Sequence, residues 1–71
     1  MPKTLILLRH AKSAWPDGVA DSQRPLAKRG RRDSPAAGRC LRERDLAPEI
    51  ALVSSTRRAV ETFELVAAEL P

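Results

Sequence analysis

Four apolar residues in a row, Leu5 to Leu8, stop abruptly at Arg9 and His10. A short run that is continuously apolar, rather than alternating, is typical of a strand covered on both faces, as in a parallel sheet. A second short apolar run covers Ile50 to Val53. We therefore predict two buried parallel strands, Thr4 to Leu8 and Ile50 to Val53.

The residues between the two runs contain a loop and a helical segment. Residues 9–25 include prolines, a glycine and several polar residues, and we expect a loop there. The next segment is rich in Ala, Arg, Leu and Glu, but Pro35 lacks a backbone N–H and crowds the preceding turn of a helix. We expect a short turn from Ala27 to Arg32, then a helix from Pro35 to Arg44 with Ser34 as its N-cap. The inner face of that helix would carry Ala37, Cys40 and Leu41.

A second helix is predicted after the second apolar run. Its apolar stripe has spacings of four, three and four residues, as in an amphipathic helix, and consists of Ala59, Phe63, Val66 and Leu70. The order strand, loop, helix, strand, helix predicts an α/β fold with a right-handed crossover between parallel strands. Two strands are too few for an independent sheet, so we expect part of a sheet rather than a whole one.

The composition excludes some classes of protein. The 71 residues carry a net charge of +4 and a single cysteine, which rules out an internal disulfide framework and favours a reducing compartment. No apolar run approaches the roughly 18 residues of a membrane span, so we predict a cytoplasmic protein without a membrane partner. The basic run "KRGRR", Lys28 to Arg32, lacks the interleaved aromatic residues of a nucleic-acid platform and fits a solvated face better.

Charged and polar residues follow both predicted strands. Arg9 and His10 come after the first strand, and Ser54 comes after the second, shortly before Arg57 and Arg58. The carboxyl ends of parallel strands share one edge of a sheet, where ligands bind in open α/β folds. Guanidiniums and a helix N-terminus both bind phosphate, and a neutral imidazole beside a phosphoryl group is a nucleophile. The alternative is that His10 only makes a hydrogen bond at a strand end.

Four stretches together resemble a known family. They are "LLRHAKS" at residues 7–13, "RPLAKRG" at 24–30, "LVSSTRRAVET" at 52–62 and the helical stretch 63–70. In this order they resemble the histidine phosphatase superfamily, with its phosphoglycerate mutase-like fold, and most closely its SixA-type phosphohistidine phosphatase branch. The resemblance implies a three-layer α/β/α architecture, of which this chain would supply a β-α-β-α portion.

The resemblance also implies roles for individual residues. Arg9 would bind the phosphoryl group, His10 would be the nucleophile that becomes phosphorylated, and Arg58 would be the second phosphate ligand. Arg24 would be an extra substrate contact, and the alternative is a surface arginine kept for its charge. Arg57 would be a surface neighbour. Trp15 would pack the loop, and the alternative is that it covers the pocket. Thr62 and Ser55 would be structural residues, which cap a helix or pack against it.

One expected element of the family site is absent. The resemblance implies a second histidine on a later strand, whereas this sequence has only His10. We therefore expect residues 1–71 to be the N-terminal part of a single histidine phosphatase domain, truncated before its later strands. We also expect the 71-residue chain by itself to be inactive.

The predicted function is hydrolysis of protein phosphohistidine through a phosphohistidine intermediate on His10. One alternative is a small-molecule phosphomonoesterase or mutase of the same superfamily, acting on a small phosphate ester. Another is a basic, non-catalytic module that binds nucleic acid or protein. The sequence contains no metal-ligand cluster and no glycine-rich nucleotide motif, so no cofactor is implied.

Overall fold

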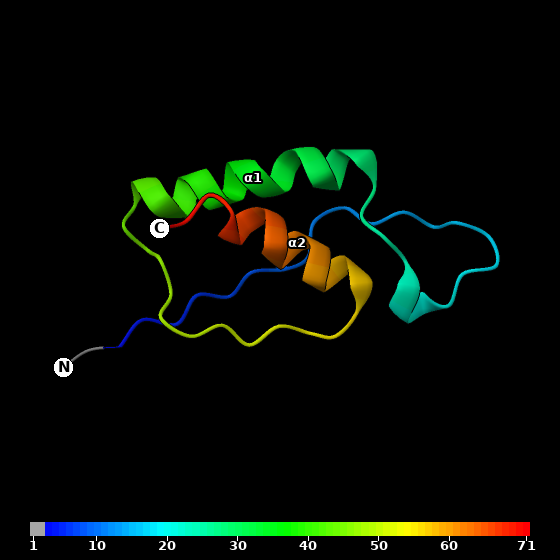
Figure 1. The fold of residues 1–71 in the computed structure, drawn as a ribbon, viewed down its shortest axis with the longest axis horizontal. Coiled ribbons are helices and arrows are strands. Elements are labelled where there is room, and N and C mark those ends of the chain that lie inside the picture. Colours follow the sequence, from blue (N-terminus) through cyan, green and yellow to red (C-terminus); the bar gives the residue numbers. More distant parts are fainter. Residues whose placement is uncertain (1–2) are drawn as a thin grey trace.

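The structure is a computed structural model, and it describes residues 3–71. In that range it contains a 3₁₀ helix η1, Asp21–Gln23, and two α-helices, α1, Lys28–Glu43, and α2, Arg57–Ala67. The helices α1 and α2 pack against each other, and η1 contacts α2. Figure 1 shows the two extended segments, residues 3–10 and 47–56, on the same side of the helix pair, running in the same direction.

The predicted parallel strands are not formed within residues 3–71. Both segments are extended, but the one bridge described is an antiparallel contact between Ser13 and Leu26. The predicted burial is also wrong, because Leu5 is 82% and Leu52 is 98% exposed. A strand is defined by hydrogen bonds to a neighbour, and two short segments have no third strand to complete a sheet around them.

The predicted break at Pro35 is wrong, because α1 is continuous through this residue. Ser34 does not cap a new helix, and its hydroxyl donates to the carbonyl of Gly30 at 2.7 Å. Gly30 and Gly38 lie on either side of the proline, and both are buried. Gly30 lies against the backbone carbonyl of Lys12, and Gly38 lies against the backbone carbonyl of Val66. We attribute the continuity of α1 to these two contacts, which lie before and after the site of the missing hydrogen bond.

The inner face of α1 is made of small residues instead of the predicted apolar ones. Gly30, Ser34 and Gly38 are buried at a spacing of four, whereas Cys40 is exposed and Ala37 and Leu41 are half-buried. A Cβ at Gly38 would lie 2.5 Å from the carbonyl oxygen of Val66 in α2. The two helices therefore approach so closely that this position has no room for a side chain.

The predicted stripe of α2 is confirmed in part. Val66 is 3% exposed, while the other three members, Ala59, Phe63 and Leu70, are half-buried. Leu26, 1% exposed, is the other buried apolar residue within the described range. It is fixed by backbone hydrogen bonds on both sides, from Ala14 N–H to the Pro25 carbonyl at 2.9 Å and from Ala27 N–H to the Lys12 carbonyl at 2.8 Å.

The chain is less compact than a complete domain of its length. Its radius of gyration is 13.1 Å, whereas about 11 Å is expected for a compact domain of 71 residues. The difference is consistent with the two extended segments, whose apolar side chains lie on the surface. None of the helices in residues 3–71 combines the length and the apolar character that crossing a membrane requires.

Candidate functional site

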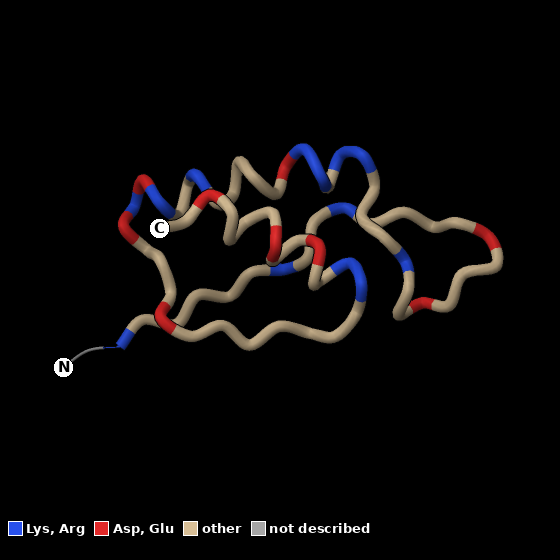
Figure 2. Tube along the Cα trace, in the orientation of Figure 1, with Lys and Arg blue, Asp and Glu red and all other residues tan. Residues whose placement is uncertain are grey.

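An open pocket of about 500 Å³ lies where the loop after residue 8 meets the starts of both α-helices. All four predicted site residues line it, and the full lining is Arg9, His10, Ala11, Lys12, Ser13, Trp15, Arg24, Arg29 and Arg58. Figure 2 shows Lys and Arg positions from several segments near the starts of α1 and α2. The structure therefore brings together the imidazole and the guanidiniums that the sequence placed at one edge of a sheet.

The imidazole of His10 is oriented by its neighbour. Its Nδ1 lies 2.8 Å from the carbonyl oxygen of Ala11. A carbonyl can only accept a hydrogen bond, so Nδ1 carries the proton in this arrangement. In the neutral ring, Nε2 is then left with a free lone pair, which is the form that can attack an electrophile.

Thr62 connects the His10 loop to α2. Its hydroxyl accepts a hydrogen bond from the N–H of Ala11 at 3.0 Å and donates to the carbonyl of Arg58 at 2.7 Å. The side chain is buried, with 4% of the residue exposed. The predicted structural role of Thr62 is confirmed, and the two bonds fix the segment that follows His10 against the turn that carries Arg58.

Arg58 reaches the pocket from the first turn of α2. Its guanidinium donates through Nη1 to the Asp21 carbonyl at 2.8 Å and through Nη2 to the Asp21 carboxylate at 3.1 Å. The preceding residue, Arg57, is exposed, does not line the pocket and lies 3.6 Å from the Glu61 carboxylate. The prediction that Arg57 is a surface neighbour is confirmed.

Arg24 is not the surface arginine that the sequence left open as an alternative. It is 7% exposed, and it donates to the Ala14 carbonyl at 2.9 Å, to the Ser13 hydroxyl at 2.7 Å and to the Asp21 carboxylate at 3.1 Å. Its guanidinium also lies over the Trp15 ring, with Cζ 3.2 Å from the centroid. Three of its bonds are thus already made to protein groups, and only its remaining N–H groups can face a ligand.

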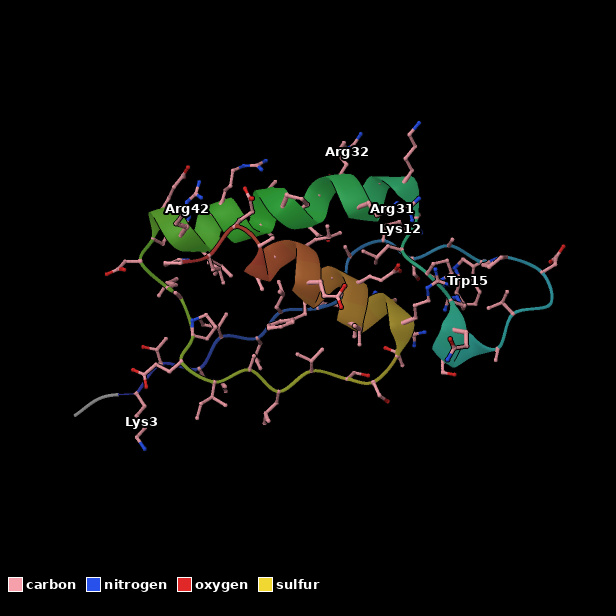
Figure 3. The ribbon with its side chains drawn as sticks, viewed as in Figure 1. Lys3, Lys12, Trp15, Arg31, Arg32 and Arg42 are labelled. Carbon is pink, nitrogen blue, oxygen red and sulfur yellow. The ribbon has the colours of Figure 1, made fainter. Side chains whose placement is uncertain are left out.

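Trp15 does not pack the loop as predicted. The residue is 75% exposed, and one face of the indole is covered by the Arg24 guanidinium. Figure 3 shows Trp15 beside η1 and Lys12 below the first turn of α1. The indole contributes to the rim of the pocket and leaves much of its surface to solvent.

Asp21 is the main site-related residue that the sequence analysis missed. Hydrogen bonds from Arg24 and Arg58, together with their positive charge, lower the pKa of the Asp21 carboxyl below its ordinary value of 3.8. A signal was present in the sequence, because Asp21 precedes Arg24 by three residues, a spacing at which side chains of a helical turn meet.

The run Lys28 to Arg32 forms the first turns of α1, in which the four basic residues are exposed and Gly30 is buried. Arg31 donates to the carbonyl of Leu26 at 2.7 Å, and Arg29 and Arg32 lie 3.6 and 3.3 Å from the carboxylate of Asp33. Three of its cations therefore have acceptors within the chain. These contacts fit the predicted solvated face.

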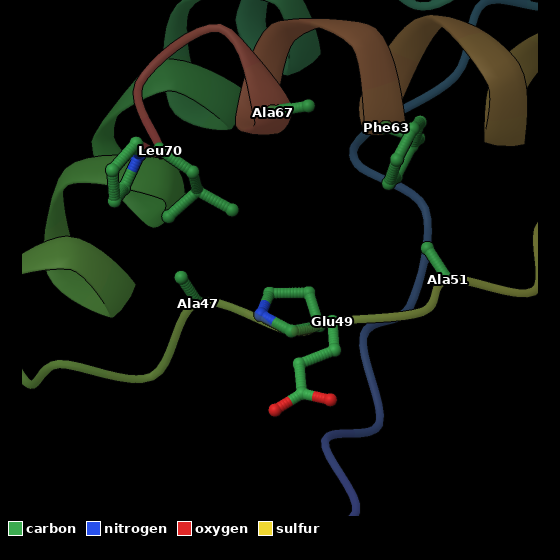
Figure 4. Close-up of a pocket in the computed structure, with 8 residues that line it drawn as sticks. Ala47, Glu49, Ala51, Phe63, Ala67 and Leu70 are labelled. Atoms are coloured by element: carbon green, nitrogen blue, oxygen red, sulfur yellow. The ribbon is translucent and has the colours of Figure 1, made fainter.

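A second, smaller pocket is lined mainly by apolar residues and by Glu49. It has a volume of about 250 Å³, lies between residues 47–51 and the end of α2, and is lined by residues such as Phe63, Ala67 and Leu70. Figure 4 shows these side chains around the opening, with the Glu49 carboxylate directed away from it. It has no imidazole or guanidinium in its lining. Within residues 3–71, no group of three or more His, Cys, Asp and Glu side chains is placed to hold a metal ion.

The sequence matches the family described as "Histidine phosphatase superfamily (branch 1)" over residues 5–71. An uncharacterised protein of Mycobacterium tuberculosis is 45% identical over 64 residues, which are 90% of this chain and 40% of that protein. A 2,3-bisphosphoglycerate-dependent phosphoglycerate mutase of Bifidobacterium longum is 36% identical over 70 residues, covering 92% of this chain and 28% of the mutase.

Two solved structures superpose closely on this chain. One is a putative phosphohistidine phosphatase SixA from Agrobacterium tumefaciens, with a TM-score of 0.83 and 28% identity over 87% of this chain and 41% of that protein. The other is a protein histidine phosphatase SixA complexed with tungstate, with a TM-score of 0.82 and 35% identity over 89% of this chain and 40% of that protein. The chain thus spans less than half the length of each protein named here. The matches support the α/β fold of the phosphoglycerate mutase type.

Proposed function

The chain belongs to the histidine phosphatase superfamily, and we propose that His10 accepts a phosphoryl group during the hydrolysis of protein phosphohistidine. One observation carries the proposal: His10 lines the same pocket as Arg9, Arg24 and Arg58. The two similar structures are a putative phosphohistidine phosphatase and a protein histidine phosphatase, both of the SixA type, and this similarity favours phosphohistidine as the substrate.

The chemistry follows from the orientation of the imidazole. With the proton on Nδ1 held by the Ala11 carbonyl, the lone pair of Nε2 attacks phosphorus in line with the leaving nitrogen of the substrate. The bond to that nitrogen breaks and its electron pair stays on the substrate imidazole, which leaves as a neutral ring when its other nitrogen carries a proton. Phosphohistidine thereby forms on His10. Arg9 and Arg58 stabilise the negative charge on the three oxygens that are not displaced. Water then attacks the phosphohistidine, which releases inorganic phosphate and restores the imidazole.

We further propose that residues 1–71 are the N-terminal part of one domain, and that the two extended segments are strands of its sheet. Support comes from the share of the similar structures that the chain covers, about two fifths, and from the exposed apolar residues of both segments. The second histidine implied by the family resemblance would then lie in the remaining part. The cytoplasm as the site of action stays a prediction from the sequence.

A second candidate is phosphoryl transfer on a small phosphate ester, as a phosphomonoesterase or a mutase. The similarity to phosphoglycerate mutases favours it. An ester has a poorer leaving group than phosphohistidine and needs a general acid to protonate it. The relative rates of hydrolysis of a phosphohistidine peptide and of a phosphate monoester therefore distinguish the two candidates.

The first test measures binding of inorganic phosphate to the 71-residue chain by calorimetry. We expect Arg58→Ala to weaken binding at least about tenfold, which corresponds to roughly 1.4 kcal/mol, because a charge-assisted contact is lost. Arg57→Ala is the matched control, since it removes the same charge one residue away and outside the pocket. Equal weakening by both variants would contradict the proposal.

The second test concerns the nucleophile. Phosphoramidate, a small P–N compound, is offered to the chain, and phosphohistidine is detected in alkali, where it is stable. His10→Ala should bind inorganic phosphate within a few-fold of the wild type. If the wild-type chain forms phosphohistidine, the product should be absent from His10→Ala, and a product that persists in this variant would overturn the assignment of the nucleophile. If the wild-type chain forms none, as we expect for residues 1–71 alone, the same comparison is made in a chain extended by the rest of the proposed domain.

A further inference from the structure

Asp21 joins two arginines of the pocket. Its Oδ1 accepts from Arg24 Nη1 at 3.1 Å, and its Oδ2 accepts from Arg58 Nη2 at 3.1 Å. The backbone carbonyl of Asp21 accepts a third hydrogen bond, from Arg58 Nη1 at 2.8 Å. One residue of η1 therefore fixes the relative positions of a guanidinium from the loop and a guanidinium from α2.

The carboxylate makes these contacts from outside the pocket. Arg24 and Arg58 line the pocket, and Asp21 does not. A carboxylate that occupied the place of a bound anion would itself be part of the lining. Arg58 also retains its Nε–H and the second hydrogen of each terminal nitrogen, so it can hold Asp21 and a ligand at the same time.

The exposure of Asp21 argues against a role in folding alone. Its side chain is 67% exposed, and that of Arg58 is 17% exposed. Ion pairs with an exposed member contribute little to stability. An arginine has many rotamers, however, and a neighbour that holds it in one of them removes part of the entropic cost of binding a ligand.

We propose that Asp21 is a positioning residue. Its carboxylate holds the Arg58 guanidinium next to that of Arg24, in an orientation that can bind a tetrahedral anion in the pocket. The proposal rests on the proposed function of this pocket as a phosphate site. It extends that function to a residue that does not itself touch the substrate.

The direction in which Asp21→Asn changes the affinity for phosphate distinguishes a positioning role from an effect of charge alone. Loss of a carboxylate near the pocket raises the local positive potential, and by Coulomb attraction alone Asp21→Asn would bind phosphate more tightly. Positioning predicts the opposite, because Arg58 is released to other rotamers. Asp17→Asn is the matched control: Asp17 lies in the same loop, is exposed, and has no hydrogen-bond or ion-pair partner within residues 3–71.

The experiment is calorimetric titration of the 71-residue chain with inorganic phosphate. We expect Asp21→Asn to weaken binding about five- to tenfold and Asp17→Asn to change it less than about twofold. Asp21→Glu should recover part of the loss, because the carboxylate is kept. Circular dichroism verifies that each variant keeps its helices.

A second readout does not depend on affinity. The ¹⁵N relaxation of the Arg58 Nε–H group should show greater motion in Asp21→Asn than in the wild type or in Asp17→Asn. Unchanged or tighter phosphate binding by Asp21→Asn, or unchanged motion of Arg58, overturns the positioning role and leaves the proposed function intact. A wild-type chain that does not bind phosphate overturns both.

Discussion

The hydroxyl of Thr62 accepts a hydrogen bond from the backbone N–H of Ala11 at 3.0 Å, across 51 positions of the sequence. Ala11 is the residue whose carbonyl orients the His10 imidazole. Thr62 belongs to α2, one turn after Arg58, and donates to the Arg58 carbonyl at 2.7 Å. One buried side chain therefore fixes the position of the proposed nucleophile relative to that of the proposed phosphate ligand.

Replacement of Thr62 tests this connection. Thr62→Val keeps the shape of the side chain but leaves the Ala11 N–H without its acceptor, which should lower the free energy of unfolding by about 1–3 kcal/mol. Thr62→Ser keeps the hydroxyl and serves as the control. Urea unfolding gives the stability of both variants, and phosphate titration gives their affinity. Equal stability and affinity of the two variants would show that the hydroxyl does not hold the His10 loop.

The site was more predictable from the sequence than the fold. His10, Arg9 and Arg58 were placed together by a rule about where extended segments end, and this rule requires only that both segments point the same way. Figure 1 shows that they do. The pairing of these segments into a sheet depends on neighbours that residues 3–71 do not provide, so Leu5 and Leu52 are exposed although their pattern indicates burial.

The helix that contains Pro35 shows a different limit. Local chemistry predicted a helix start at Ser34 and Pro35, but α1 is continuous there, and Gly30 and Gly38 lie in close tertiary contacts on either side of the proline. A sequence pattern predicts the apolar face of a helix well, but it does not predict which glycines allow two helices to approach closely. Asp21 was missed for a related reason, since the arginine that it holds from α2 lies 37 positions away in the sequence.

Gly38→Ala tests the close contact of the two helices. In an open helix position this change stabilises by up to about 1 kcal/mol. Here the added Cβ would lie 2.5 Å from the Val66 carbonyl oxygen and 2.9 Å from the Cβ of Glu69, and we expect a net loss of about 1–3 kcal/mol from overpacking. Cys40→Ala, at an exposed position of α1, should stay within about 0.5 kcal/mol of the wild type. Stabilisation by Gly38→Ala in thermal unfolding would contradict the contact.

Asp21 should make a small contribution to the acid sensitivity of the fold, because its ion pairs with Arg24 and Arg58 are partly exposed. Its pKa in the folded chain is below the ordinary value of 3.8. A lowered pKa means that the ionised form stabilises the fold, so this contribution is present above that value and is lost as the pH falls through the folded pKa. The stability difference between the wild type and Asp21→Asn, from urea unfolding, should therefore be positive near neutral pH and vanish in strong acid. A difference that is constant with pH would refute the linkage.

Leu26 and Leu52 should respond in opposite ways to substitution. Leu26 is 1% exposed, and Leu26→Ala should cost about 2–5 kcal/mol, because it leaves a cavity in a small core. Leu52 is 98% exposed, so Leu52→Lys should change the stability of the chain by less than about 0.5 kcal/mol.

The Leu52→Lys substitution should also reduce self-association of the 71-residue chain, since an extended apolar segment with free backbone groups pairs with other chains and a lysine discourages that pairing. Urea unfolding and sedimentation velocity measure the two effects. Destabilisation by Leu52→Lys as large as that by Leu26→Ala would mean that residues 50–53 are covered in solution, as a strand within a sheet would be.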